Sequence, residues 1–196
     1  MSTKGLSKKI IVDEAVVYIE ENGRPDISLH EIARRLGIKT PSLYNHIENT
    51  KELQYSVFKV AIEKFVKNQN IAIKNKQKDE AVKAFAKAYH TFATENRGLY
   101  LLIMSMPSEN DEISKKMAVP LLDIVINILS KYNLPEEKIA HWQRVFRAIL
   151  HGFISQEYLG YFYYYSDIDL NESREIAIKC FLDGLHAEMK GDDIKK

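Results

Sequence analysis

The sequence has a single cysteine, Cys180, among its 196 residues. One thiol forms neither an intrachain disulfide nor a zinc site built from cysteines, so both kinds of cross-link are excluded. No apolar run approaches the roughly 18 residues that a membrane-spanning helix needs. Residues 1–9 also lack the apolar core of a secretory signal peptide. We therefore expect a cytoplasmic protein without a membrane partner.

The motifs of common enzymes are missing as well. The sequence has no glycine-rich phosphate loop and no nucleophile motif, and its six histidines show no close metal-binding spacing such as H-E-x-x-H. We therefore expect no catalytic residues, no metal site and no cofactor.

Positive and negative side chains are nearly equal in number. The 28 Lys and Arg residues face 27 Asp and Glu residues, which leaves a net charge of +1. Such a chain has no strong bulk attraction for nucleic acid, so any affinity for DNA would depend on a few well-placed contacts.

The stretch 28–51, SLHEIARRLGIKTPSLYNHIENTK, carries a dense set of helix start and stop signals. Ser28 with Glu31 fits a capping box, in which the hydroxyl and the carboxylate each accept a backbone N–H. Gly37 suits a left-handed residue that ends this first helix. Thr40 before Pro41 predicts the N-cap and first position of a second helix. The stretch therefore predicts two short helices joined by a tight turn.

The second helix is expected to have an inner and an outer face. Leu43 and Ile47, four positions apart, are expected to face inward. Polar donors and one aromatic hydroxyl remain outside and form what we call the reading face: Lys39, Thr40, Ser42, Tyr44, Asn45 and His46. Asn49 with Glu52 predicts a cap for the next helix, with Lys51 in its first turn. This pattern is typical of a helix-turn-helix, whose second helix lies in the major groove of DNA.

The run IARRLGIKTPSLYNHI, followed by NTKEL, resembles the N-terminal domain of the TetR family of transcriptional regulators. The family pattern is roughly I-A-x-x-x-G-V-S-x-x-x-L-Y-x-H-F, then a lysine-rich cap and E-x-L. The positions kept are Ile32, Ala33, Gly37, Leu43, Tyr44, His46, Glu52 and Leu53. The sequence departs at Ile47, where phenylalanine is preferred, and at Thr50, where a phosphate-contacting lysine is common. We expect Lys51 to make that phosphate contact instead.

We assign expected roles to these residues on DNA. Contacts to base edges or methyl groups are expected from Thr40, Ser42, Tyr44 and Asn45, and Pro41 is expected to touch a thymine methyl. Phosphate contacts are expected from Ser28, Lys39, His46 and Lys51. The alternative is that these are ordinary capped helices of an all-α protein, with Tyr44 as a packing residue.

Helical spacing of apolar residues continues through the rest of the chain, and only the tyrosine run near 161–165 has any strand-like character. We expect an all-α fold of about nine helices. Beyond the two helices described above, they are expected near 6–21, 50–70, 79–95, 99–104 (ended by Pro107), 110–132, 135–160 and 169–189. The helix-turn-helix domain is expected at 5–65, and a helical regulatory and dimerisation domain at 66–190.

The helix expected at 135–160 has one stripe of bulky side chains and one stripe of small side chains. The small stripe consists of Val145, Ala148, Gly152 and Ser155. A glycine inside a helix costs roughly 1 kcal/mol relative to alanine, so a close partner helix would explain it. We expect this stripe, with Phe181 and Leu185 of the last helix, to form the interface of a homodimer that reads a palindromic operator. The alternative is an intrachain core helix.

The segment HWQRVFRAILHGF resembles the C-terminal region of TetR regulators, through Trp142 and the pair His151-Gly152. The resemblance implies a pocket for a small-molecule effector, whose binding moves two DNA-binding heads off the spacing of the operator. The expected lining residues are Phe85, Tyr89, Phe92, Tyr100, Met104, Met117, Ile124, Trp142, Phe146 and Gln156, although such residues at helical spacing also fit a plain core. We expect a ligand-responsive repressor. The alternative is a TetR-like factor that binds DNA or a protein and senses no small molecule.

Overall fold

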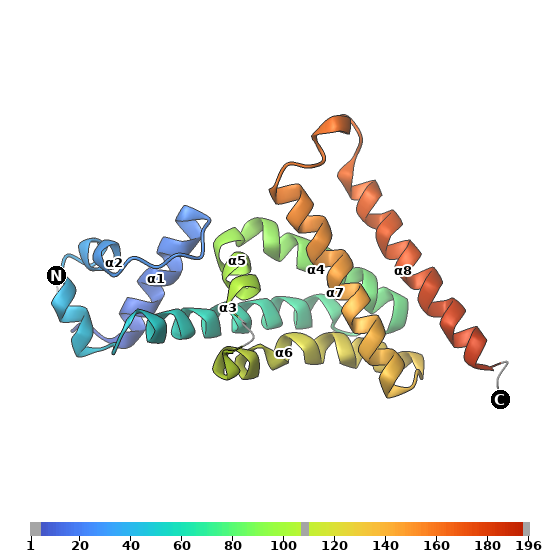
Figure 1. Ribbon diagram of the computed structural model, residues 1–196, viewed down its shortest axis with the longest axis horizontal. Helices are drawn as coiled ribbons and strands as arrows, with labels where there is room; N and C mark the ends of the chain where they lie inside the picture. Colours follow the sequence, from blue (N-terminus) through green and yellow to red (C-terminus); the bar gives the residue numbers. More distant parts are fainter. Residues whose placement is uncertain (1–4, 107–109, 194–196) are drawn as a thin grey trace. The chain divides into compact units, whose positions relative to one another are not determined.

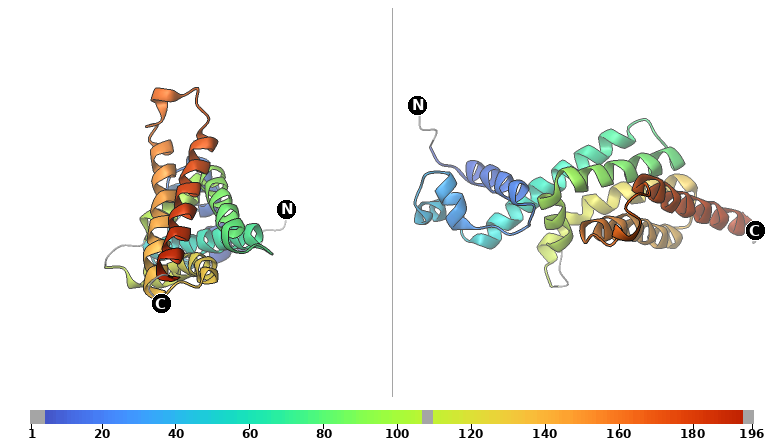
Figure 2. Two further views of the ribbon diagram at one scale, coloured as in Figure 1. Left: turned by 90° about the vertical axis from the view of Figure 1, so that its right-hand side faces the viewer. Right: turned by 90° about the horizontal axis from the view of Figure 1, so that it is seen from above.

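Helices make up all the regular structure in the computed structural model, which describes residues 5–106 and 110–193 (Figures 1 and 2). Within these residues there are eight α-helices, three 3-10 helices and no strand. The all-α prediction is therefore confirmed. The elements are α1 (Lys8–Asn22), α2 (Leu29–Arg35), η1 (Thr40–Asn45), α3 (Thr50–Ile73), α4 (Lys78–Glu95), α5 (Arg97–Ser105), α6 (Glu112–Leu129), η2 (Ser130–Tyr132), α7 (Glu136–Tyr158), η3 (Tyr163–Tyr165) and α8 (Leu170–Asp193).

The chain divides into two compact units. The first unit takes the residues up to Val66 together with Phe92–Pro120, and the second takes Lys67–Thr91 together with the residues from Leu121 onward. The units therefore differ from the contiguous ranges 5–65 and 66–190, because α5 and the start of α6 group with the N-terminal helices. Pro107, expected to end the helix at 99–104, lies outside the described residues.

In the first unit, α1 packs closely against α5. Ile11, Ala15 and Ile19 of α1 are fully buried. A Cβ atom added to Gly98 of α5 would lie 2.2 Å from the carbonyl oxygen of Ile19, so only glycine fits there. The Leu99 N–H donates to the Glu20 carboxylate at 3.0 Å. The helix that braces the helix-turn-helix is thus fixed to α5 through its C-terminal end.

In the second unit, α7 and α8 lie side by side in opposite directions and are joined by a turn that contains η3 (Figures 1 and 2). Phe146 stacks on Phe181 with the ring centroids 4.6 Å apart, and it lies 5.7 Å from Phe85 of α4. The tyrosine run near 161–165 forms a turn and a 3-10 helix, and its strand-like character does not produce a strand. Buried aromatic rings therefore hold α4, α7 and α8 together.

Two further properties concern the described helices as a set. None of them is both long and apolar enough to cross a lipid bilayer. Within residues 5–106 and 110–193, no group of three or more His, Cys, Asp or Glu side chains is arranged to hold a metal ion.

Candidate nucleic-acid interface

The start of α2 follows half of the predicted capping box. The Glu31 N–H donates to Ser28 Oγ at 3.3 Å, as expected. The Glu31 carboxylate accepts a hydrogen bond from Arg34 Nε at 2.7 Å, and no bond returns it to the Ser28 N–H. The second half of the prediction is therefore wrong, because a guanidinium three residues ahead on the same helix face attracts the carboxylate more strongly than a neutral amide.

The turn after α2 depends on Gly37. Its φ of +68° lies in the left-handed region, as predicted for the residue that ends this helix. The Gly37 N–H donates to the Arg34 carbonyl at 3.1 Å, and the Ile38 N–H donates to the Ala33 carbonyl at 3.0 Å. These two bonds satisfy the last carbonyls of α2 and direct the chain into the next helix.

The second helix of the motif is a 3-10 helix, η1, and its cap differs from the prediction. Lys39 has the extended conformation of an N-cap, whereas Thr40, predicted to be the N-cap, is already the first helical residue. The Ser42 N–H donates to the Lys39 carbonyl at 2.9 Å. Because Pro41 has no N–H and the element is only six residues long, i→i+3 bonds close it more easily than a full α-helical ladder would.

The side chains of η1 separate into buried anchors and an outer face. Leu43 is fully buried and Ile47, just after η1, is 2% exposed, which confirms the predicted anchors. Tyr44 is 53% exposed, so its ring is no packing residue. Lys39, Pro41 and Asn45 are also exposed, and Thr40, Ser42 and His46 are half-buried. The residues of the predicted reading face therefore lie on η1 and on its two cap residues, Lys39 and His46.

Lys51 lies in the first turn of α3, the helix that follows η1 in the chain. The Glu52 N–H donates to Asn49 Oδ1 at 2.9 Å, which confirms the predicted cap. The Glu52 carboxylate accepts the Glu48 N–H and pairs with Lys8 of α1. The Lys51 side chain is 65% exposed, so its ammonium is available to a phosphate.

Most cations around the reading face are already paired. Arg34 pairs with Glu31, and Arg35 pairs with Glu14 and with Glu21, the latter at 2.6 Å. The Arg35 hydrogen bond holds the pKa of the Glu21 carboxyl below its ordinary value. In the described part of the chain, Lys39 has no ion-pair partner. The free positive charge near the face is therefore small, in line with the balanced composition.

The predicted dimer residues separate into an exposed and a buried group. Val145 is 44% exposed, Ala148 is exposed, and Gly152 and Ser155 are half-buried. A Cβ atom at Gly152 would meet nothing within 4 Å in the chain. Phe181 and Leu185, in contrast, are at most 2% exposed. Their assignment to the interface is wrong, because the apolar face of α8 that carries them packs against α7, which periodicity alone does not reveal.

The ten predicted pocket residues are divided between the two units. Phe92, Tyr100, Met104 and Met117 belong to the first unit, and Phe85, Tyr89, Ile124, Trp142, Phe146 and Gln156 belong to the second. Phe85 and Phe146 fill the core of the second unit, whereas Gln156 is exposed. The ten residues therefore include members of both units, with buried and exposed positions among them.

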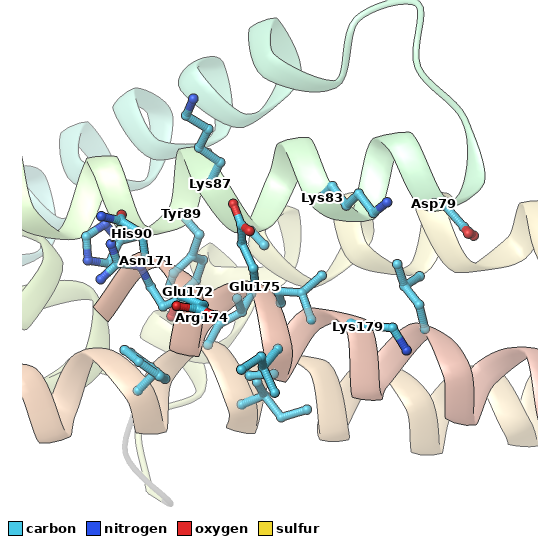
Figure 3. Close-up of a pocket in the computed structure, with 18 of the residues that line it drawn as sticks. Asp79, Lys83, Lys87, Tyr89, His90, Asn171, Glu172, Arg174, Glu175 and Lys179 are labelled. Atoms are coloured by element: carbon cyan, nitrogen blue, oxygen red, sulfur yellow. Dashed lines mark hydrogen bonds between the residues drawn. The ribbon is translucent and has the colours of Figure 1, made fainter. Parts of the chain in front are cut away.

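The second unit contains a cavity of about 1070 Å³ between α4, α7 and α8 (Figure 3). Tyr89 is the one predicted pocket residue among its lining residues. Its apolar wall includes Ala86, Ile149, Leu150, Phe153 and Ile154, and its charged rim includes Lys83, Lys87, Arg174, Glu175 and Lys179. Figure 3 shows the rim residues projecting from α4 and from α8. The rim comes from helices far apart in the sequence, so no local motif could have identified it.

Two polar clusters include residues that line this cavity. In the first cluster, Glu157 Oε2 lies 2.9 Å from His90 Nε2 and 3.5 Å from Arg174 Nη1. In the second cluster, Asp79 accepts a hydrogen bond from the Tyr132 hydroxyl at 2.8 Å and lies 3.0 Å from His186 Nε2. Burial and the Asp79 hydrogen bond raise the pKa of Tyr132, so its hydroxyl remains a donor.

A small, capped helical pair with an exposed polar face is typical of DNA-binding proteins of the helix-turn-helix class. The family described as "Tetracyclin repressor-like, C-terminal domain" matches residues 82–181. The chain belongs to the TetR family and is a DNA-binding transcriptional regulator.

Relatives and solved structures agree with this membership. The HTH-type transcriptional regulator YobS of Bacillus subtilis is 30% identical over 186 residues, which cover 92% of this chain and 93% of YobS. An uncharacterised HTH-type regulator of Mycobacterium tuberculosis is 30% identical over 160 residues, covering 79% and 72% of the two chains. The Streptomyces coelicolor TetR family protein ActR, solved in complex with (S)-DNPA, has the same fold, with a TM-score of 0.63 at 16% identity over 94% of this chain and 99% of ActR.

Proposed function

We propose that the protein is a homodimeric repressor that binds a palindromic operator and is released from it by a small, largely apolar ligand. The observation that carries the DNA-binding part is the reading face, in which an exposed Tyr44 and Asn45 stand over the buried anchors Leu43 and Ile47. Buried anchors fix the orientation of the exposed side chains, and a fixed orientation is what contact with base edges requires.

The proposed contacts divide into two kinds. Thr40, Ser42, Tyr44 and Asn45 contact base edges, with Pro41 against a thymine methyl. Ser28, Lys39, His46 and Lys51 contact phosphates, which position the protein but carry no sequence information.

The test is selection of binding sites from a random duplex pool, followed by two variants. We expect a palindrome to emerge. Asn45→Ala should lose about 1–3 kcal/mol on that operator and little on random DNA. Lys51→Met should weaken binding to both DNAs alike. It should also reduce the slope of log K against log salt concentration by about one. Equal losses on both DNAs for both variants would contradict this division of roles.

The proposed dimer uses the outer face of α7, where Val145, Ala148, Gly152 and Ser155 are at least partly exposed. The last helix, α8, lies beside α7 (Figure 1) and is proposed to take part in the same interface. Two helices from each copy would bury this small-residue surface and give the two-fold symmetry that a palindrome requires.

The proposed ligand site is the cavity between α4, α7 and α8. Its apolar wall suits an apolar molecule, and the ActR complex with (S)-DNPA is an example of a ligand bound to a protein of this fold. Binding of the aromatic probe 1-anilinonaphthalene-8-sulfonate, followed by its fluorescence, tests the site. Ala86→Trp, which fills the wall, should weaken probe binding, whereas Lys67→Trp on the exposed face of α3 should not. If the two variants bind the probe equally, the ligand lies elsewhere, or the protein senses none.

A further inference from the structure

Four residues of the first unit form a polar cluster beside the helix-turn-helix. Lys51 and Tyr55 lie in the first two turns of α3, and Asp111 and Ser114 lie at the start of α6. The Tyr55 hydroxyl is 2.9 and 2.8 Å from the two carboxylate oxygens of Asp111. The Ser114 N–H donates to Asp111 Oδ1 at 3.1 Å, as it would to an N-cap residue. The Asp111 carboxylate is therefore held at a fixed position.

This carboxylate is the anion next to Lys51. Lys51 Nζ lies 3.9 Å from Asp111 Oδ2 and 5.4 Å from the centre of the Tyr55 ring. The Lys51 side chain is 65% exposed and that of Asp111 only 12%. The lysine can thus move toward solvent, whereas the carboxylate stays in place.

Asp111 is ionised wherever the protein would bind DNA. The Ser114 N–H, the Tyr55 hydroxyl and the Lys51 ammonium hold the pKa of the Asp111 carboxyl below its ordinary value of 3.8. A fixed negative charge about 4 Å from the lysine attracts the same ammonium that a phosphate would attract, and it repels the phosphate itself.

We propose that Asp111 competes with the DNA backbone for Lys51 and so limits the affinity of the protein for DNA. This inference rests on the phosphate contact of Lys51 proposed above. Tyr55 is a positioning residue in this arrangement. Because its hydroxyl binds both carboxylate oxygens, it holds Asp111 at the edge of ion-pairing distance and leaves Lys51 free to exchange partners.

The experiment measures binding to a mixed-sequence 30-base-pair duplex by fluorescence anisotropy over a range of salt concentrations. Asp111→Asn keeps the size and one oxygen that can still accept the Ser114 N–H, while it removes the charge and replaces the second carboxylate oxygen with an amide NH2 group. We expect its affinity for DNA to rise about two- to fivefold, the change expected when a weak competing ion pair is lost. Asp13→Asn is the matched control, because Asp13 is an acid of the same unit that pairs with Lys9. It should change affinity much less.

The same change is then made in a Lys51→Met background, where the gain from Asp111→Asn should largely disappear. An equal gain in both backgrounds would show a general charge effect and overturn the proposal, as would an unchanged or reduced affinity of Asp111→Asn itself. If Lys51→Met alone left DNA binding unchanged, the phosphate contact would be the part that fails.

Tyr55→Phe gives a second test, in which DNA affinity is expected to fall and not to rise. Without the hydroxyl, the carboxylate is free to approach Lys51, so DNA affinity should fall, and Asp111→Asn should restore it. A loss that Asp111→Asn does not restore would overturn the positioning role of Tyr55. Thermal unfolding of each variant, followed by circular dichroism, checks that the fold is kept.

Discussion

Single residues with unusual surroundings fix the local geometry of the first unit. Gly37 has a φ of +68° and open space around its Cα, whereas Gly98 has no room for a side chain because the Ile19 carbonyl lies against it. The two glycines are therefore required for different reasons, one conformational and one steric.

Replacement of these glycines by alanine should separate the two reasons. Gly37→Ala should lower the free energy of unfolding by about 1–2 kcal/mol, the cost of a left-handed alanine. Gly98→Ala should cost more, about 3 kcal/mol, because a backbone carbonyl cannot move aside as a flexible side chain does. Urea unfolding measures both, with Gly5→Ala as the control, since its Cβ would meet nothing within 4 Å. Equal losses for Gly37→Ala and Gly98→Ala would argue against the steric account.

Gln69 is a fully buried polar residue of the second unit. When the amide is oriented to match its neighbours, its nitrogen donates to the Phe85 carbonyl at 3.2 Å and its oxygen accepts the Tyr89 N–H at 3.1 Å. The side chain of α3 thus satisfies two backbone groups one turn apart on α4.

Gln69→Leu should therefore reduce stability by about 1–3 kcal/mol, since it leaves buried backbone groups with fewer partners. The control is Gln77→Leu, at an exposed position just before α4. Chemical denaturation compares the two, and a loss no larger than that of Gln77→Leu would show that the amide bonds do not contribute.

At the scale of elements, the sequence predicted which segments are helical but not every detail of their ends or packing. Capping residues act over three or four positions, so Asn49 and Gly37 were identified correctly. The 3-10 character of η1 was missed because it depends on how a short element around Pro41 closes its bonds. The burial of Phe181 was missed for another reason: α8 has apolar residues on more than one face, and only the packing of α7 decides which face is inside.

The contact between α1 and α5 should give a pH-dependent stability. Burial raises the pKa of Glu20 above its ordinary value of 4.5, against the opposing hydrogen bond from the Leu99 N–H. The folded state then binds more protons than the unfolded state between these two pKa values. The contribution of Glu20 to the free energy of unfolding therefore falls as the pH rises through this window. Glu20→Gln should be as stable as the parent at pH 4 and more stable at pH 7.

Its neighbour Glu21 is the matched control with the opposite sign. The Arg35 hydrogen bond lowers the pKa of Glu21, so this group stabilises the fold above pH 4.5 and loses that effect as the pH falls. Glu21→Gln should therefore be less stable than the parent at pH 7. Urea unfolding at both pH values measures the pair, and shifts of the same sign in the two variants would contradict this account.

At the scale of the whole molecule, the few free cations near the reading face imply weak binding by a single copy. Two copies held in one dimer would bind two half-sites together and gain affinity without any new contact. The proposed dimer would therefore make the outer face of α7 as important to operator binding as the reading face itself.

Gly152→Leu tests this connection. A leucine at this open position should not disturb the fold of one copy, because its Cβ meets nothing within 4 Å. It should, however, keep a second copy at a distance, so sedimentation should show monomers and operator affinity should fall. Lys67→Leu, which adds an exposed leucine on α3, should remain a dimer. An unchanged mass for Gly152→Leu would place the interface elsewhere.

Trp142 is the only tryptophan of the chain. Its ring lies edge-on to Phe181, 5.4 Å between centroids, and its Cη2 atom would be 3.0 Å from a Cβ on Gly184. Intrinsic emission excited at the red edge of the absorption band therefore comes from the α7–α8 contact and from no residue of the helix-turn-helix. A change in that emission when DNA is added would be a direct optical signal, without any attached label, that the second unit responds to an event at the first.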